Sequence, residues 1–309
     1  RANGMMSLIY SGPAVLAPML AGILLPIIQL TGILTIDVVT FFLAIGALLI
    51  VNVPQPVKTV EGQAEQGSLL KEGLYGFKYI FARRSLLGLL IFFICLNFTV
   101  GMAINLFAPF ILTRTNYNSA SLGAVESAAA VGAVVGGILV TAWPGFKRRM
   151  TNIFVGEAVT GLFMLTLFGL GRSLPVWIIF AALGSITPVF VNGSSQAIWQ
   201  SKVAPDLQGR VFSARRMIAW ITDPITPLLA GALADYVTEP GMQAGGLLAS
   251  TFGWLVGTEP GSGMALQFFF AGIGYMLVVL GVYLFFPVVR NLEDLLPDHD
   301  QLEKIEEQA

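Results

Sequence analysis

The chain has 309 residues, of which 55% are hydrophobic and only 11% are charged, and its mean hydropathy is +0.78. Soluble domains carry about 25% charged residues, so this composition excludes an ordinary water-soluble domain and predicts a protein embedded in lipid. A net charge of −1, one cysteine and one histidine argue against nucleic-acid binding, a disulfide framework and a metal site, and we expect no cofactor.

Eight apolar stretches follow one another along the chain. Each is long enough to cross a bilayer as a helix, which takes about 20 mostly apolar residues. They cover residues 6–30, 33–52, 86–111, 121–142, 151–170, 174–198, 213–236 and 265–288. These stretches predict an all-α fold, a polytopic membrane helix bundle with eight transmembrane helices.

The first stretch repeats part of the seventh. Pro18–Leu24 recurs 209 positions later as Pro227–Leu233, and at the same offset Arg1 aligns with Arg210. A repeat of this length is typical of a bundle built twice, although apolar segments can also resemble one another by chance. Because the first copy starts at residue 1, we expect that preceding helices are missing from this sequence.

A polar segment, residues 53–85, separates the second stretch from the third. Its first part is linker-like, and its second part carries an apolar helical face with basic residues beside it. This pattern predicts a short amphipathic helix that lies on an anionic membrane surface or, equally, caps the bundle. The apolar face consists of Leu69, Leu70, Leu74, Phe77, Ile80 and Phe81.

The basic residues predict the orientation of the bundle. If Arg1 is cytoplasmic, alternation of the loops places 15 of the 17 Lys and Arg residues on the cytoplasmic side, and only Arg114 and Arg172 outside. The Gly- and Pro-rich segment 237–264 then forms an external loop, packed back on the bundle or with Trp254 at the lipid headgroups. The acidic C-terminus from residue 290 is expected to be a soluble, partly helical tail.

Ionisable residues inside membrane spans are costly and usually mark a functional site. Asp223 lies midway along the seventh stretch, where Pro224 and Pro227 remove two backbone donors and predict a kink. The freed carbonyls beside a carboxylate would suit a proton or a cation, unless Asp223 merely bonds the opened backbone. Glu126 and Glu157 are further candidates for proton coupling, and either could instead reach the interface or pair with a loop cation.

Neutral polar residues and small residues complete the candidate pathway. Asn97 with Asn105, and Asn192 with Gln196, each lie near one helical face and could line a substrate path or bond a neighbouring helix. The pair Gly132 and Gly136 predicts close helix packing. The residues expected at helix kinks or gates are Pro13, Pro18, Gly22, Pro224, Pro227 and Gly231.

No catalytic motif is present in the sequence: it has no nucleophile elbow, no paired-histidine zinc motif and no phosphate-binding loop. We therefore expect no catalytic residues and no enzyme activity. Without a nucleotide site, any transport must draw its energy from a gradient or from a partner subunit.

Five segments are similar to segments of one membrane protein family, the major facilitator superfamily, and within it to the branch of enterobactin exporters and macrolide-efflux proteins. They are Arg1–Gly4, Ser11–Gly22, Ile36–Phe41, Pro205–Ser213 and Pro287–Asp298. The most specific of them resembles the loop before the family's eleventh helix and contains Asp206, Gly209 and Arg210. The loop between helices eight and nine keeps its basic residues at 145–149 without the family's acidic residue.

The resemblance implies that the eight stretches are helices five to twelve of a twelve-helix fold made of two six-helix repeats. Residues 1–52 would be the last two helices of the N-terminal half, and 53–85 a cytoplasmic central loop with an amphipathic helix. Residues 86–289 would form the six-helix C-terminal half, and 290–309 a cytoplasmic tail.

The resemblance also implies a function, a secondary transporter of the bacterial inner membrane that exports an amphipathic small molecule, such as a drug or siderophore, against proton entry. Transport would proceed by alternating access, with the substrate, protons and the lipid bilayer as partners and a monomer as the full-length form. A lysophospholipid flippase is the alternative. Remoter alternatives are a receptor and a membrane-embedded enzyme whose three carboxylates bind Mg²⁺ at a lipid phosphate.

Overall fold

The computed structural model describes residues 28–29, 31–47, 49–50, 69–143 and 145–299. The chain divides into two compact units, Arg1–Val57 and Lys58–Ala309. In the first unit the helix Thr31–Ala47 is apolar but shorter than a full span, and it covers most of the second predicted stretch. The first predicted stretch falls almost entirely outside the described residues.

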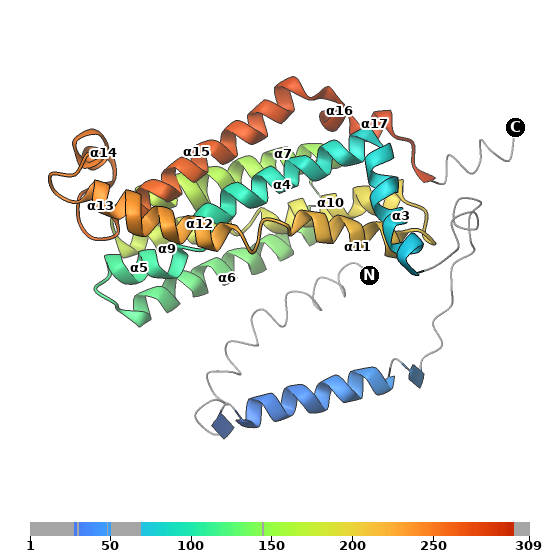
Figure 1. The fold of residues 1–309 in the computed structure, drawn as a ribbon, viewed down its shortest axis with the longest axis horizontal. Helices are drawn as coiled ribbons and strands as arrows, with labels where there is room; N and C mark the ends of the chain where they lie inside the picture. The colour runs from blue at the N-terminus through green and yellow to red at the C-terminus, as the bar shows by residue number, and fades with distance from the viewer. Residues whose placement is uncertain (1–27, 30, 48, 51–68, 144, 300–309) are drawn as a thin grey trace, which may run out of the picture. The chain divides into compact units, whose positions relative to one another are not determined.

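The second unit is a bundle of helices, and its described part contains no strand (Figure 1). Within the described residues, five helical stretches are long and apolar enough to cross a membrane, and they match five of the predicted stretches to within four residues at either end. They are Arg84–Arg114, Ser119–Ala142, Arg149–Leu170, Leu174–Lys202 and Ser262–Phe285. The prediction of an all-α, polytopic membrane bundle is confirmed.

Several of these spans are composite. The first joins α4 (Arg84–Ile104) to α5 (Phe107–Arg114), the second is α6 (Ser119–Ala142), and the last is α15 (Ser262–Phe285). The third consists of α7 (Arg149–Thr160), the π-helix η1 (Gly161–Leu167) and α8 (Phe168–Leu170). The fourth consists of α9 (Leu174–Gly184) and α10 (Pro188–Lys202).

The seventh predicted stretch is not a continuous helix. It is divided into α11 (Gln208–Ala219), a run of turns over residues 220–225, α12 (Thr226–Leu233) and the π-helix η2 (Ala234–Thr238). The predicted kink is therefore present, and it is a full interruption. A proline at 224 disfavours helical geometry for the residue before it, and a second proline at 227 removes another donor.

Aromatic side chains form the core at one end of the bundle. Phe110, Phe168 and Phe268 are fully buried, and their ring centroids lie 5.2–5.8 Å apart. Trp177 closes the cluster edge-on to Phe110 at 5.5 Å and donates its indole N–H to the Gly171 carbonyl. This cluster joins α5, α8, α9 and α15, so burial of aromatic surface holds four helices in place.

Glycines set the close contact between α6 and the α9–α10 span. A Cβ atom at Gly132 would lie 2.8 Å from the Ala182 carbonyl carbon, and one at Gly136 would lie 3.0 Å from that of Ile186. Only glycine fits at both positions because backbone faces backbone there. The prediction of close packing by this Gly-x-x-x-Gly pair is confirmed.

Helix α3 (Leu69–Ala82) caps one end of the bundle. The helix was predicted, but its contact face differs from the predicted apolar face: Tyr75, Tyr79 and Ile80 are buried, whereas Leu74 and Phe81 are exposed. The packing explains the difference, because α3 lies against α11 and the Tyr79 hydroxyl donates to the Lys202 carbonyl at 3.0 Å. The side chains of residues 69–73 lie outside the description.

The predicted external loop packs onto the bundle through the two arginines expected on its side. It contains α13 (Glu239–Met242) and α14 (Ala249–Val256), which lie beside α5 in Figure 1. Arg114 donates to the Glu259 carboxylate at 2.8 Å and to the Val256 carbonyl at 2.7 Å. Arg172 donates to the Trp254 carbonyl at 2.7 Å, while the Trp254 ring itself stays exposed.

The C-terminal segment is docked, which corrects the expectation of a free tail from residue 290 onward. After α16 (Pro287–Arg290) comes α17 (Leu292–Leu295), in which Leu292 is fully buried. The Glu293 carboxylate accepts hydrogen bonds from the first two backbone N–H groups of α7 at 3.2 and 3.1 Å. A carboxylate at a helix N-terminus is favourable because it satisfies free donors and the positive end of the helix dipole. Residues 300–309 are outside the description.

Candidate functional site

The interruption between α11 and α12 is the most unusual feature of the predicted site. In a continuous helix the Asp223 N–H would donate to the Ala219 carbonyl, but here it donates to the Trp220 carbonyl at 3.1 Å. The Ala219 carbonyl accepts instead from the side-chain amide of Asn97, at 3.1 Å. An amide from α4 thus replaces the backbone bond that the interruption removes.

A second amide, that of Asn105 at the C-terminal cap of α4, holds the other side of the interruption. Asn105 Nδ2 lies 3.3 Å from the hydroxyl of Thr226, the first residue of α12, and 2.7 Å from the Gly101 carbonyl. Thr226 is buried, and a Cβ atom at Gly101 would lie 2.8 Å from its Cβ atom. Helix α4 therefore contacts the broken span both before and after the turns, as the eight-residue spacing of its two asparagines allows.

Asp223 itself faces away from these contacts. Asp223, Pro224 and Ile225 are exposed, whereas Thr222 is buried, and its hydroxyl has no hydrogen-bond partner among the residues that the structure describes. The Asp223 carboxylate accepts no hydrogen bond from any described residue, so it does not stabilise the opened backbone in the way that the alternative interpretation proposed. The result is an accessible carboxylate halfway along a broken span.

A cation missed by the sequence reasoning lies two helical turns before Asp223. Arg215 donates to Gln196 Oε1 and to Ser195 Oγ, each at 3.2 Å, and its guanidinium carbon lies 5.0 Å from the Trp199 ring centroid. No carboxylate is paired with it within the described part of the chain. Its position inside the predicted seventh stretch was the available signal, but the charge pattern placed it only on the cytoplasmic side.

Glu157 lies apart from the interruption. Its side chain is buried on α7, where it accepts a hydrogen bond from the Tyr275 hydroxyl of α15. The alternative that it pairs with the basic cluster at 147–149 is wrong. Arg149 donates to the Ala197 carbonyl and Ser201 Oγ, and Arg148 forms an ion pair with Asp294 at 3.0 Å.

The remaining predicted site residues fall at several places. Glu126 on α6 and Asn192 on α10 are exposed, and Gly231 on α12 has open space where a Cβ atom would lie. Pro227 is the second residue of α12, where a missing N–H costs nothing. Three of the expected kink residues lie outside the described residues, namely Pro13, Pro18 and Gly22.

The predicted loop motif forms the tight turn between α10 and α11. Asp206 and Arg210 are partly buried, and Gly209 is exposed with open space around it. The Gln208 side chain donates to the Val203 carbonyl at 3.0 Å, which satisfies a backbone acceptor just after the end of α10. Elsewhere in the described chain, no group of three or more His, Cys, Asp or Glu residues could hold a metal ion.

Comparisons with known proteins show which family the sequence resembles. A family model described as Major Facilitator Superfamily matches residues 1–227. The chain is similar to macrolide efflux protein A of Streptococcus pyogenes, with 26% identity over 229 residues, which are 72% of this chain and 55% of that protein. It is also similar to macrolide efflux protein A of Enterococcus faecalis, with 27% identity over 217 residues, 68% of this chain and 65% of that protein.

The chain spans 55–65% of the length of these curated relatives. No solved structure matches it significantly.

Proposed function

Because the chain belongs to the Major Facilitator Superfamily, we propose that it is a secondary transporter that exports an amphipathic small molecule in exchange for protons. The observation that carries this proposal is the interrupted span, with Asp223 exposed in the turns. Asn97 bonds the Ala219 carbonyl before the turns, and Asn105 bonds the Thr226 hydroxyl after them. Discontinuous helices at mid-depth are typical of substrate and coupling-ion sites in transporters.

The interruption gives a physical route to alternating access. An ionised carboxylate at mid-depth must face water or a partner, whereas a protonated one can be covered by apolar surface. Proton binding at Asp223 would thus favour a state in which the broken span is covered, and proton release would favour an open state. The amides of Asn97 and Asn105 would keep α11 and α12 anchored to α4 while the turns between them bend.

Other polar residues extend this proposed pathway. Glu126 on α6 is the second carboxylate that we propose for proton coupling, and Glu157, enclosed between α7 and α15, is the third. Asn192, Gln196 and Arg215 form a polar wall on α10 and α11 that would contact the polar part of a substrate.

The relatives named macrolide efflux protein A make a macrolide the first substrate to test, with a siderophore as the second. We propose that the protein resides in a bacterial cytoplasmic membrane with its C-terminus in the cytoplasm. The distribution of charge supports this orientation. Arg148, Arg149 and Lys202 lie at the end capped by α3 and α17, and Arg114 and Arg172 lie at the other end.

The test is gradient-driven uptake of a radiolabelled macrolide into proteoliposomes that contain the intact protein. We expect Asp223→Asn to reduce uptake driven by a pH gradient at least tenfold, while macrolide exchange without a gradient persists. Asp235→Asn is the matched control, because Asp235 is an exposed acid at the end of the same span. Equal gradient dependence in wild type and Asp223→Asn would contradict proton coupling through this residue.

The same proteoliposomes separate the alternatives. A lysophospholipid flippase would transport a fluorescent lysophospholipid without any pH gradient and would not transport the macrolide. A receptor or an enzyme would transport neither compound.

A further inference from the structure

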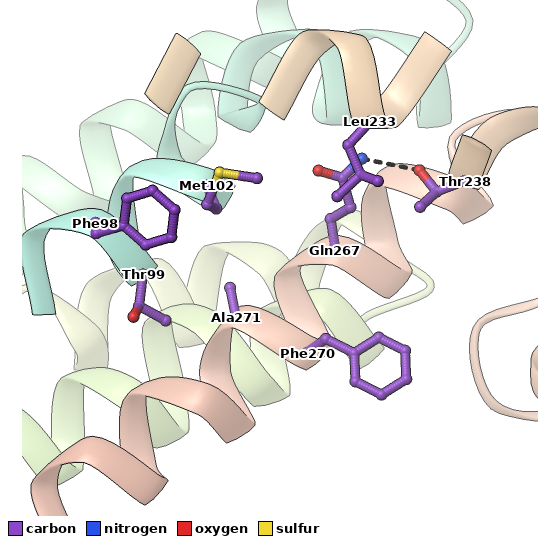
Figure 2. Close-up of a pocket in the computed structure, with 8 residues that line it drawn as sticks. All are labelled: Phe98, Thr99, Met102, Leu233, Thr238, Gln267, Phe270 and Ala271. Atoms are coloured by element: carbon purple, nitrogen blue, oxygen red, sulfur yellow. Dashed lines mark hydrogen bonds between the residues drawn. The ribbon is translucent and has the colours of Figure 1, made fainter. Parts of the chain in front are cut away.

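A pocket of about 260 Å³ lies away from the interrupted turns, between α4, α12, η2 and α15 (Figure 2). Its walls are mainly apolar. Phe98 and Met102 come from α4, Leu233 from α12, and Phe270 and Ala271 from α15. The volume lies just below the 300–1,000 Å³ of typical ligand sites, so it suits a bicyclic ring and not a macrocycle.

One polar side chain is built into this apolar pocket. Gln267 is 5% exposed, and its amide nitrogen donates to the Thr238 hydroxyl at 2.8 Å. Its amide oxygen is buried without a hydrogen-bond partner among the described residues. Figure 2 shows this oxygen turned to the Met102 side of the pocket and the nitrogen turned to Thr238. A buried acceptor without a donor is unfavourable, so a molecule that supplies a donor is stabilised there.

The rim of the pocket belongs to an exposed apolar surface. A stripe of exposed apolar side chains runs along α15 for four turns, and Phe270 at the rim is its first member. The members of this stripe are Phe270, Ile273, Leu277, Leu280 and Leu284. On a helix long and apolar enough to cross a membrane, such a face favours contact with hydrocarbon, so we infer that a ligand would enter from the bilayer.

We propose that this pocket is a lateral binding site for a small apolar ring compound that carries one hydroxyl or N–H group and enters from the bilayer. The ring occupies the space beside Phe98 and Phe270, and the donor bonds the Gln267 oxygen. Met102 gives the donor access, because an unbranched thioether can change rotamer at little cost. The site lies within the second unit and does not depend on the proposed efflux activity.

The test compares two bicyclic probes of matched shape, 2-naphthol and 2-methylnaphthalene, of which only the first has a donor. Binding to the intact protein in lipid nanodiscs is measured by calorimetry for wild type and for Gln267→Leu. We expect Gln267→Leu to weaken the affinity for 2-naphthol about 2- to 10-fold, as the loss of one net hydrogen bond predicts. The affinity for 2-methylnaphthalene should stay unchanged. Comparing each probe with itself between variants cancels its partition into lipid.

Two further variants locate the binding and guard against a folding defect. Ala271→Phe fills the pocket from its buried wall and should abolish saturable binding of both probes. Leu277→Ala, on the same stripe two turns after Phe270, should leave the binding of both probes unchanged. Equal loss of both probes in Gln267→Leu, or full binding in a well-folded Ala271→Phe protein, would overturn the proposal.

Discussion

At the scale of single residues, Glu157 shows how one hydrogen bond permits a buried acid. It is the only acidic side chain that is buried in the described chain, with 7% exposed, and the Tyr275 hydroxyl is its donor. A Cβ atom at Gly161 would lie 2.8 Å from the Tyr275 ring, so the start of η1 holds the ring in place. The acid, the tyrosine and the π-helix therefore form one packed unit between α7 and α15.

We predict that Tyr275→Phe destabilises the protein by about 1–3 kcal/mol, because it leaves the buried Glu157 carboxyl group without its donor. The measurement is the thermal unfolding temperature in detergent. Tyr283→Phe is the control, since Tyr283 lies on the same helix and is 45% exposed. The double variant Glu157→Met/Tyr275→Phe should recover part of the loss, because it removes both partners. A double variant that is less stable than Tyr275→Phe would refute this account.

The positions and hydrogen-bond partners of single residues could be predicted from the sequence to different degrees. The spacing of Asn97 and Asn105 placed them correctly on one face of α4, but their partners are the carbonyl and hydroxyl groups at a break in another helix. Sequence spacing gives the face of one helix and carries no information on which helix lies opposite. For the same reason Arg215 was not predicted as a site residue, because its acceptors lie on α10.

At the scale of helices, the long spans could be predicted from the sequence, whereas the close contacts between helices could not. Hydrophobic length predicted five described spans to within four residues, since a bilayer demands long apolar helices. The π-helices η1 and η2 were not predicted. Both pack closely against α15, where Gly272 faces Thr166 of η1 and Gly263 faces Thr238 of η2. Such close approaches arise between segments about 100 and about 25 residues apart in the chain and leave no local pattern.

Two of the glycines of α6, Gly132 and Gly123, should respond to alanine with opposite changes in stability. Gly132→Ala places a Cβ atom against the backbone of Ala182, so we expect a loss of about 1–3 kcal/mol as α6 and α9 separate. Gly123→Ala meets nothing within 4 Å and should gain up to about 1 kcal/mol from helix propensity. The change in the free energy of unfolding of both variants is measured by chemical unfolding in mixed micelles. A neutral Gly132→Ala would show that the α6–α9 contact is loose.

At the scale of the second unit, polar clamps close both ends of an apolar bundle. Arg114 and Arg172 hold the loop that contains α14, and Lys202 and Glu293 hold the C-terminal segment at the opposite end (Figure 1). The sequence predicted the side on which each arginine lies but not the docking of the C-terminus, because its acidic composition suggested solvation. Those acids instead satisfy a helix N-terminus and a buried lysine.

Lys202 is the centre of the C-terminal clamp, and its removal should release the segment. Its ammonium group is buried, donates to the carbonyls of Glu293 and Leu296, and forms an ion pair with Asp298 at 2.9 Å. Burial raises the pKa of Asp298, but the hydrogen bond and attraction from Lys202 outweigh it and leave the pKa below the ordinary 3.8. A lowered carboxyl pKa stabilises docking above pH 3.8, and that contribution is lost as the pH falls through the lowered value.

We therefore expect Lys202→Met to speed proteolytic cleavage after residue 290 at least tenfold at neutral pH, whereas wild type resists cleavage until the medium becomes strongly acidic. Asp298→Asn should have a smaller effect, because the two carbonyl acceptors of Lys202 remain. Lys147→Met is the matched control, since Lys147 is an exposed cation near the start of α7. Cleavage is read by mass spectrometry at pH 7 and, with an acid protease, below pH 4. If Lys202→Met is cleaved no faster than Lys147→Met, the contacts of Leu292, Glu293 and Asp294 hold the segment in place without Lys202.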